Sequence, residues 1–300
     1  MAAITLQEPF RAVFYTPFYA ALARGDFSRA GVEVTLITVG DPDRAMGNLL
    51  SGAADLAWSG PMRMIREHAQ NSGSPLVSFG AVVMADPFFL VGRGKRPGFQ
   101  PSDLADLTLG VVSEVPTPWW CLQHDLRQAG IDPAALRTVT GRTMAENAAA
   151  VADGTLDVAQ LFEPFVGQLE AQGGEVWYAQ ASRGPTSYTA FYATKQIIAA
   201  KREAMRGMVR GLAAMQAWLH AAAAAEIAAT VAPFFEGTDR AVLERAIARY
   251  RSLGIWATTP RFPRDAFETL EAAMLGAGAI ARNPGFEACV DSAIEEEALA

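Results

Sequence analysis

Short apolar runs alternate along the chain with stretches in which apolar residues recur every three or four positions. The first pattern is typical of buried strands and the second of amphipathic helices. In the first part of the chain it predicts strands at Ala12–Phe14, Val32–Val39, Leu56–Trp58 and Leu76–Val83. Helices are predicted between them at Pro17–Arg24, Asp43–Ser51 and Met62–Asn71. This alternation indicates a βαβ series, as in α/β proteins.

A second series of the same kind follows. Its predicted strands are Leu107–Val112, Leu136–Val139, Val158–Leu161 and Val176–Tyr178. Its predicted helices are Pro118–Ala129, Met144–Asp153 and Pro164–Gln172. Each helix is followed by a glycine, as expected where a helix ends in a left-handed residue. Two separate α/β units are therefore the simplest interpretation.

Two extended segments, Phe88–Gly92 and Tyr188–Ala193, flank the second series, and the chain after Lys201 is almost wholly helical. A unit inserted between two such segments indicates that the chain crosses from one lobe to the other and back. We therefore predict an α/β fold of two doubly wound lobes joined by two hinge strands, with a helical C-terminal extension on lobe 1. Lobe 1 is predicted to comprise residues 1–90 and 190–300, and lobe 2 residues 91–189.

Four predicted strands end in a polar or small residue that is followed by proline and a helix. These joins are Phe14–Pro17, Trp58–Pro61, Glu114–Trp120 and Phe162–Pro164. Proline suits the first helical position because the N–H it lacks would have no partner there. The carboxyl ends of strands in an open α/β sheet lie together, and helix N-termini face the crevice beside them. Aromatic residues crowd the same joins, so the sequence predicts a cleft lined by rings and helix ends.

Composition narrows the class of protein. With 300 residues, 51% of them hydrophobic, the chain is long enough for two packed domains and is not a disordered protein. The net charge of −7 and scattered basic residues argue against nucleic acid as a partner. Two distant cysteines and three separated histidines give no metal-binding spacing, so we expect no metal or other cofactor. The N-terminus does not resemble a secretory signal. We expect a periplasmic protein if a signal has been removed, and otherwise a cytoplasmic one.

The stretch from Phe14 to Gly60 resembles the N-terminal signature of substrate-binding proteins of ABC importers, in the group that binds nitrate, alkanesulfonates, taurine and thiamine-pyrimidines. The matching segments are Tyr19–Phe27, Ala30–Val34 and Leu49–Ala57, and later Ser102–Leu107, Leu126–Asp132, Val151–Ala159 and Phe162–Phe165. The resemblance implies a type II periplasmic binding protein fold, a small-molecule ligand and an ABC permease as partner. It does not extend to the cysteine-rich segment of the thiamine-pyrimidine synthase branch, so that enzymatic role is not carried over.

Ten residues at the joins and on the returning strand are predicted to contact the ligand. They are Tyr15, Thr16, Phe18, Trp58, Ser59, Gly60, Thr117, Trp119, Glu163 and Tyr188. The rings would stack on a planar ligand, and Ser59 with the nearby helix end would donate to an anionic or carbonyl oxygen. Adjacent helical residues point about 100° apart, so Trp119 and Trp120 cannot both face the cleft, and Trp119 is favoured because it lies nearer the helix start.

Structural alternatives stay open for several of these residues. Phe18 would also be explained as packing beneath the first helix, and Ser59 as an ordinary helix cap. Glu163 either accepts hydrogen bonds from a ligand N–H or pairs across the lobes with an arginine, for which Arg183 and Arg142 are candidates.

The first functional hypothesis is a monomeric, non-catalytic protein that traps a small aromatic or heteroaromatic molecule, with carboxylated ligands included. The second is a cytoplasmic enzyme on the same scaffold, such as a decarboxylase or lyase, with Glu163, Tyr15 or His124 as acid–base candidates. The third is a cytoplasmic ligand sensor. The sequence leaves the identity of the ligand open.

Overall fold

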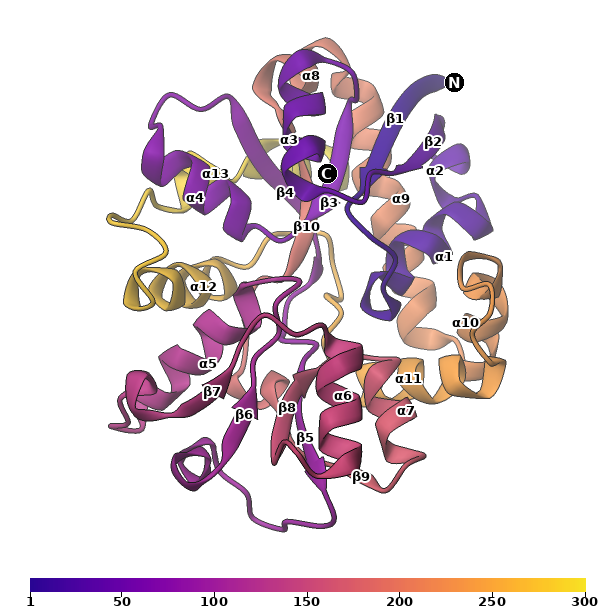
Figure 1. Cartoon of the computed structure of the whole chain (residues 1–300). Coiled ribbons are helices and arrows are strands. Elements are labelled where there is room, and N and C mark those ends of the chain that lie inside the picture. Colours follow the sequence, from indigo (N-terminus) through magenta and orange to yellow (C-terminus); the bar gives the residue numbers. More distant parts are fainter.

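Two lobes, each built on a five-stranded sheet, make up the molecule (Figure 1). The computed structural model describes residues 1–300, apart from the side chains of Pro42 and Asp43. The lobe 1 sheet contains β1 (Ala2–Glu8), β2 (Val32–Thr38), β3 (Leu56–Ser59), β4 (Leu76–Val83) and β10 (Thr189–Thr194), in the order β2-β1-β3-β10-β4. The lobe 2 sheet contains β5 (Phe89–Arg93), β6 (Thr108–Gly110), β7 (Arg137–Val139), β8 (Val158–Leu161) and β9 (Gly174–Ala179), in the order β7-β6-β8-β5-β9.

Both sheets follow one plan. Four of the five strands in each sheet run in the same direction, and the strand that follows a crossing is inserted antiparallel to its neighbours. β10 lies between β3 and β4, and β5 lies between β8 and β9. The chain crosses between the lobes over residues 84–88 and 180–188. The predicted fold of two α/β lobes joined by two connections is therefore confirmed, whereas the exact domain limits stay a prediction.

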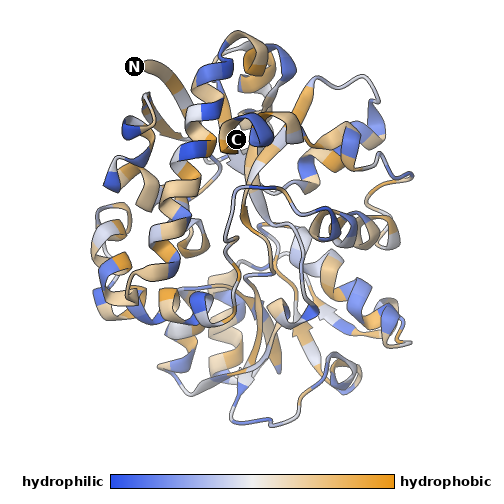
Figure 2. Ribbon diagram, turned by 180° about the vertical axis from the view of Figure 1, so that it is seen from behind, coloured by the Kyte–Doolittle hydropathy of each residue, from blue (hydrophilic) through white to orange (hydrophobic). Residues whose placement is uncertain are grey.

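Helices cover the faces of both sheets, and their residues alternate between apolar and polar along each helix (Figure 2). Lobe 1 carries α1 (Thr16–Arg24), α2 (Asp26–Arg29), α3 (Pro42–Ser51), α4 (Met62–Gln70), α8 (Lys195–Ala200) and α9 (Arg202–Ala221). Lobe 2 carries α5 (Thr117–Gln128), α6 (Met144–Asp153) and α7 (Phe165–Glu170). The C-terminal extension contains α10 (Ala224–Val231), α11 (Arg240–Ser252), α12 (Arg264–Gly276), α13 (Phe286–Cys289) and α14 (Ser292–Leu299).

The longest helix, α9, lies against α1 and α2 of lobe 1. Its apolar residues recur at helical spacing and are fully buried: Met205, Met208, Leu212, Met215 and Leu219. Gly207 and Gly211 lie on the face that meets α2 and β2, where an added Cβ would stand 2.5 Å from a Val32 or Phe27 side-chain atom. The two glycines therefore permit the close approach of helix and sheet.

The C-terminal extension reaches further than predicted. α14 packs against α9 and β4 of lobe 1, as expected for an extension of that lobe. α11 contacts α7 of lobe 2, and α12 contacts both α4 of lobe 1 and α5 of lobe 2 (Figure 1). The extension therefore bridges the lobes on two sides.

One predicted strand is wrong. Residues Val13–Tyr15 form a 3-10 turn, closed by a hydrogen bond from the Tyr15 N–H to the Ala12 carbonyl. The first strand is instead Ala2–Glu8, which pairs with β2 and β3. Three apolar residues in a row are too few to distinguish a strand from a turn, because both bury them. The first join therefore follows a loop, whereas the other three joins do connect a strand to a helix.

Candidate ligand site

A small cavity lies where the two lobes and the two crossings meet. Its walls come from lobe 1, from the first crossing, from the start of α5 and from the second crossing: Phe10, Phe14, Tyr15, Ser59, Gly60, Met62, Arg63, Phe88, Val115, Thr117 and Tyr188. Its volume is about 40 Å³, which is room for a few water molecules. Typical small-molecule sites measure about 300–1,000 Å³, so the walls must move apart to admit a ligand.

Five of the ten predicted residues meet at this cavity: Tyr15, Ser59, Gly60, Thr117 and Tyr188. Ser59 is the last residue of β3 and Thr117 the first of α5, so both lie at the carboxyl-end edges of their sheets. Tyr188 directly precedes β10, at the end of the second crossing. Their convergence follows from the geometry of α/β sheets, in which these edges face the crevice.

Trp58, Phe18 and Thr16 lie behind the cavity wall. The Trp58 and Phe18 rings stack with a centroid separation of 4.3 Å and an interplanar angle of 4°, and both are fully buried. Successive side chains of a strand point to opposite faces, so the strand that turns Ser59 toward the cavity turns Trp58 toward α1. Thr16 is also fully buried. Phe18 therefore packs beneath the first helix, which is the structural alternative to ligand contact.

Trp119 points away from the cavity. It packs on the core of lobe 2, and Trp120 packs against the larger core that spans both lobes. Thr117 and Cys121 lie one helical turn apart on the inner face of α5. Trp119 comes two positions after Thr117 and therefore faces roughly the opposite way. Neither indole lines the cavity.

Glu163 is also outside the cavity lining. Its side chain is 2% exposed and accepts hydrogen bonds from Arg249 Nη1 at 2.8 Å and from the Gly167 N–H at 3.1 Å. Burial raises the pKa of the Glu163 carboxyl, and Arg249 opposes that rise. Of the two alternatives for Glu163, the structure contains the ion pair between lobes. The partner is Arg249 of α11, so the predicted partners Arg183 and Arg142 are wrong.

Arg63 is the main residue that the sequence reasoning missed. It lies in the first turn of α4, is 8% exposed and places its Nε 3.4 Å from Ser59 Oγ. The signal that could have identified it is its position two residues after Pro61, in the first turn of a helix that begins at the crevice.

The two cavity tyrosines are hydrogen-bond donors at neutral pH. Burial is the main cause that raises the pKa of both the Tyr15 and the Tyr188 hydroxyl. Tyr188 donates to Asp86 Oδ2 at 2.5 Å. Away from the cavity lining, burial raises the pKa of the Cys121 and Cys289 thiols to about 12, so neither is a thiolate at neutral pH.

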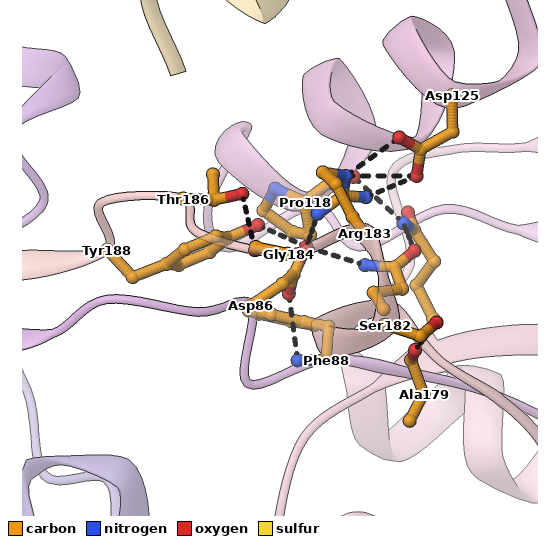
Figure 3. A network of polar contacts seen from close by, with 12 residues as sticks. Asp86, Phe88, Pro118, Asp125, Ala179, Ser182, Arg183, Gly184, Thr186 and Tyr188 are labelled. Carbon is orange, nitrogen blue, oxygen red and sulfur yellow. Dashed lines mark hydrogen bonds and ion pairs between the residues drawn. The ribbon is translucent and has the colours of Figure 1, made fainter. Parts of the chain in front are cut away.

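A buried polar network lies beside the cavity and joins the two crossings (Figure 3). Asp86, in the first crossing, accepts hydrogen bonds from Arg183 at 2.6 Å and Gln180 at 3.1 Å as well as from Tyr188. Arg183, in the second crossing, also binds Asp125 of α5 with two nitrogens. Burial raises the pKa of the Asp86 carboxyl, and Arg183 opposes this. The network therefore anchors both crossings to lobe 2.

No helix among the described residues is both long and apolar enough to cross a membrane. No group of three or more His, Cys, Asp or Glu side chains in the described part of the chain is arranged to hold a metal ion.

Comparison with solved structures supports the fold. The periplasmic aliphatic sulphonate binding protein SsuA from Escherichia coli has a TM-score of 0.73 at 16% sequence identity, covering 94% of this chain and 95% of that one. A variant of the desulfurization enzyme DSZB, in complex with biphenyl-2-sulfinic acid, has a TM-score of 0.73 at 12% identity and covers 99% of both chains. At such identities the likeness concerns the fold alone, and this fold carries both binding proteins and an enzyme.

Sequence comparison identifies the family. The chain is 26% identical over 299 residues to the "Putative binding protein YtlA" of Bacillus subtilis (strain 168), covering 98% of this chain and 89% of that protein. Residues 13–226 match the family described as NMT1/THI5 like. The matched segment is well over half of the chain and includes most of the cavity lining. The chain therefore belongs to the NMT1/THI5-like family.

Proposed function

We propose that this protein traps a small molecule between its lobes, and that the molecule carries an anionic group on an aromatic or heteroaromatic ring. The observation that carries the proposal is the cavity between the lobes, where a buried arginine and several rings face one small space. Binding would favour the closed lobes by its higher affinity for that state.

The anionic group is proposed to bind at Arg63 and Ser59. The Arg63 Nε donates to Ser59 Oγ at 3.4 Å, which holds the serine beside the guanidinium, so the Ser59 hydroxyl can donate to an oxyanion that the positive charge of Arg63 attracts. The helices α4 and α5 also begin at the cavity, and their first N–H groups add a positive potential there. The ligands named for SsuA and for the DSZB complex, a sulphonate and a sulfinic acid, are anions of this kind.

The ring of the ligand is proposed to pack against Phe10, Phe14 and Phe88, which line the cavity beside Arg63. Aromatic pairs favour edge-to-face or offset contacts, and this wall offers several ring edges and faces. Since Tyr15 and Tyr188 stay protonated, they present hydroxyl groups and rings to the cavity, and neither is a phenolate that could act as a general base. This chemistry favours binding over acid–base catalysis.

We further propose that the protein is the substrate-binding component of an ABC importer and acts in the periplasm. The resemblance of its N-terminal segments to such proteins supports this, as does SsuA, which is described as periplasmic. A membrane permease would then recognise the closed, ligand-bound form. Co-purification of the protein with a permease only in the presence of ligand would test this partner.

A thermal-shift screen followed by mass spectrometry tests the binding function. The panel contains aryl carboxylates, aryl sulfonates, alkanesulfonates, pyrimidines and flavins. Aryl anions should raise the melting temperature, because a ligand at a hundredfold excess over its Kd stabilises the folded state by about 2.7 kcal/mol. Each hit should be recovered unchanged. Consumption of a hit would indicate an enzyme, and stabilisation by uncharged or cationic rings alone would contradict the anion site.

A further inference from the structure

We propose that the Phe162 ring occupies the place that the ring of the ligand takes on binding, so that Phe162 determines which ligands the site admits. This inference rests on the proposed function. Phe162 directly follows β8 of lobe 2 and is 6% exposed.

The ring of Phe162 lies outside the cavity lining and packs against two rings that belong to it, Phe14 and Phe88. Its centroid lies 5.3 Å from Phe14 at an interplanar angle of 85°, and 5.2 Å from Phe88 at 83°. Both are edge-to-face contacts, the arrangement that an aromatic ligand would seek with the same partners. Phe14 belongs to lobe 1, and Phe88 belongs to the first crossing. Phe162 therefore makes the contacts across the cleft that the proposed function assigns to a ligand.

The small cavity requires that some ring moves when an aromatic ligand binds. About 40 Å³ holds a few waters but no phenyl ring. Phe88 is fixed beside the buried network, since its N–H donates to Asp86 Oδ1 at 2.9 Å. Phe14 packs on Tyr15 at 4.4 Å within its own lobe. Phe162 is the ring that separates from Phe14 when the lobes part, because the two belong to opposite lobes.

The C-terminal extension holds Phe162 in this position. The Glu163 N–H donates to Tyr250 Oη at 3.0 Å, which in turn donates to the Pro87 carbonyl at 3.2 Å. Arg249 binds the Glu163 carboxylate from the same helix. Trp256 Nε1 donates to the Phe14 carbonyl at 2.9 Å, so the extension is hydrogen-bonded to both sides of the contact between Phe14 and Phe162. The contact between Phe162 and Phe14, which a ligand ring must displace, is thus held in place from both sides.

Affinity measurements on matched variants test the inference. Benzenesulfonate and benzoate serve as ring-bearing probes, and methanesulfonate and acetate as ringless controls. Each is titrated into the wild type, Phe162→Ala and Phe165→Ala. Phe165 lies on the same turn and contacts the Phe162 ring at 5.8 Å, but in the described part of the chain the ring contacts with Phe14 and Phe88 are made by Phe162 and not by Phe165. Phe162→Ala should bind the ring-bearing probes about tenfold more tightly, because the Phe162 ring no longer competes with the probe ring for the same place. The ringless probes, and all probes with Phe165→Ala, should bind as to the wild type.

The outcomes separate the two proposals. If Phe162→Ala binds the ring-bearing probes as weakly as the wild type or more weakly, Phe162 only packs against the lining, and the inference is overturned while the proposed function stands. If no variant and no wild type binds any probe, the proposed anion site fails and this inference fails with it. Circular dichroism checks folding, and Phe162→Leu, which keeps an apolar side chain, must shift affinity in the same direction if Phe162→Ala does not fold.

Discussion

Removal of the Arg183 guanidinium is expected to cost much of the stability of the fold. The Arg183 side chain is 5% exposed and Asp86 is fully buried, 2.6 Å away. Arg183→Met preserves apolar bulk but leaves the Asp86 carboxylate without a cation, with Tyr188 and Gln180 as its remaining side-chain donors. Breaking a buried ion pair by removing one partner costs about 3–5 kcal/mol. That is a large part of the roughly 5–15 kcal/mol by which folded proteins are stable.

Urea unfolding, followed by circular dichroism at neutral pH, measures this loss. Arg202→Met is the matched control, because Arg202 pairs with Glu297 at the surface, where the side chains are 42% and 41% exposed. That variant should lose less than about 1 kcal/mol. Adding Asp86→Asn to Arg183→Met should restore part of the stability, since no charge then stays buried without a partner. If Arg183→Met loses no more than the surface control, the network does not hold the crossings together.

Two further predictions concern lobe 1. Glu295 accepts N–H hydrogen bonds from Gly80 and Phe262, and burial raises its pKa from 4.5 to about 7. The folded state therefore keeps a proton that the unfolded chain releases, so the contribution of Glu295 to the free energy of unfolding is complete below about pH 4.5 and is lost as pH rises through 7, by at most about 3 kcal/mol. The urea midpoint of the wild type should fall from pH 5 to pH 8, and that of Glu295→Gln should fall less. An equal fall in both proteins would contradict this assignment. Gly207→Ala would place Cβ 2.8 Å from the Ala30 carbonyl oxygen and should lower stability by about 1–3 kcal/mol. Gly47→Ala is the control, because Gly47 lies in α3 with open space around it, and this variant should raise stability by up to about 1 kcal/mol. A higher melting temperature for Gly207→Ala than for the wild type would refute the packing argument.

Most of the fold could be predicted because its elements are signalled locally. β4 and β8 are predominantly apolar runs, and the structure has them at the predicted limits. Prolines mark the starts of helices such as α5, where Pro118 is the second residue. The antiparallel insertion of β5 and β10 could not be predicted, because strand order depends on contacts between distant segments. Ala2–Glu8 was missed because a short run near a terminus has weak periodicity.

The candidate site was less predictable, since the side of an element on which a residue lies is set by packing. The join at Trp58 and Ser59 was located correctly, but only the fold decides that Ser59 faces the cavity and Trp58 the core. The partner of Glu163 comes from a helix 86 residues away in the sequence, and no local pattern connects the two. Arg63 was overlooked because a single arginine in a helix is most often solvated.

Calorimetric titration of the strongest aryl anion from the screen into the wild type and Arg63→Met tests the central claim most directly. Arg66→Met is the control, since Arg66 lies in the same helix and is absent from the cavity lining. Because hydrogen bonds to charged groups contribute about 1.5–3 kcal/mol, Arg63→Met should bind about 10- to 100-fold more weakly, and Arg66→Met should match the wild type. Equal affinity of the wild type and Arg63→Met would contradict an anion site between the lobes.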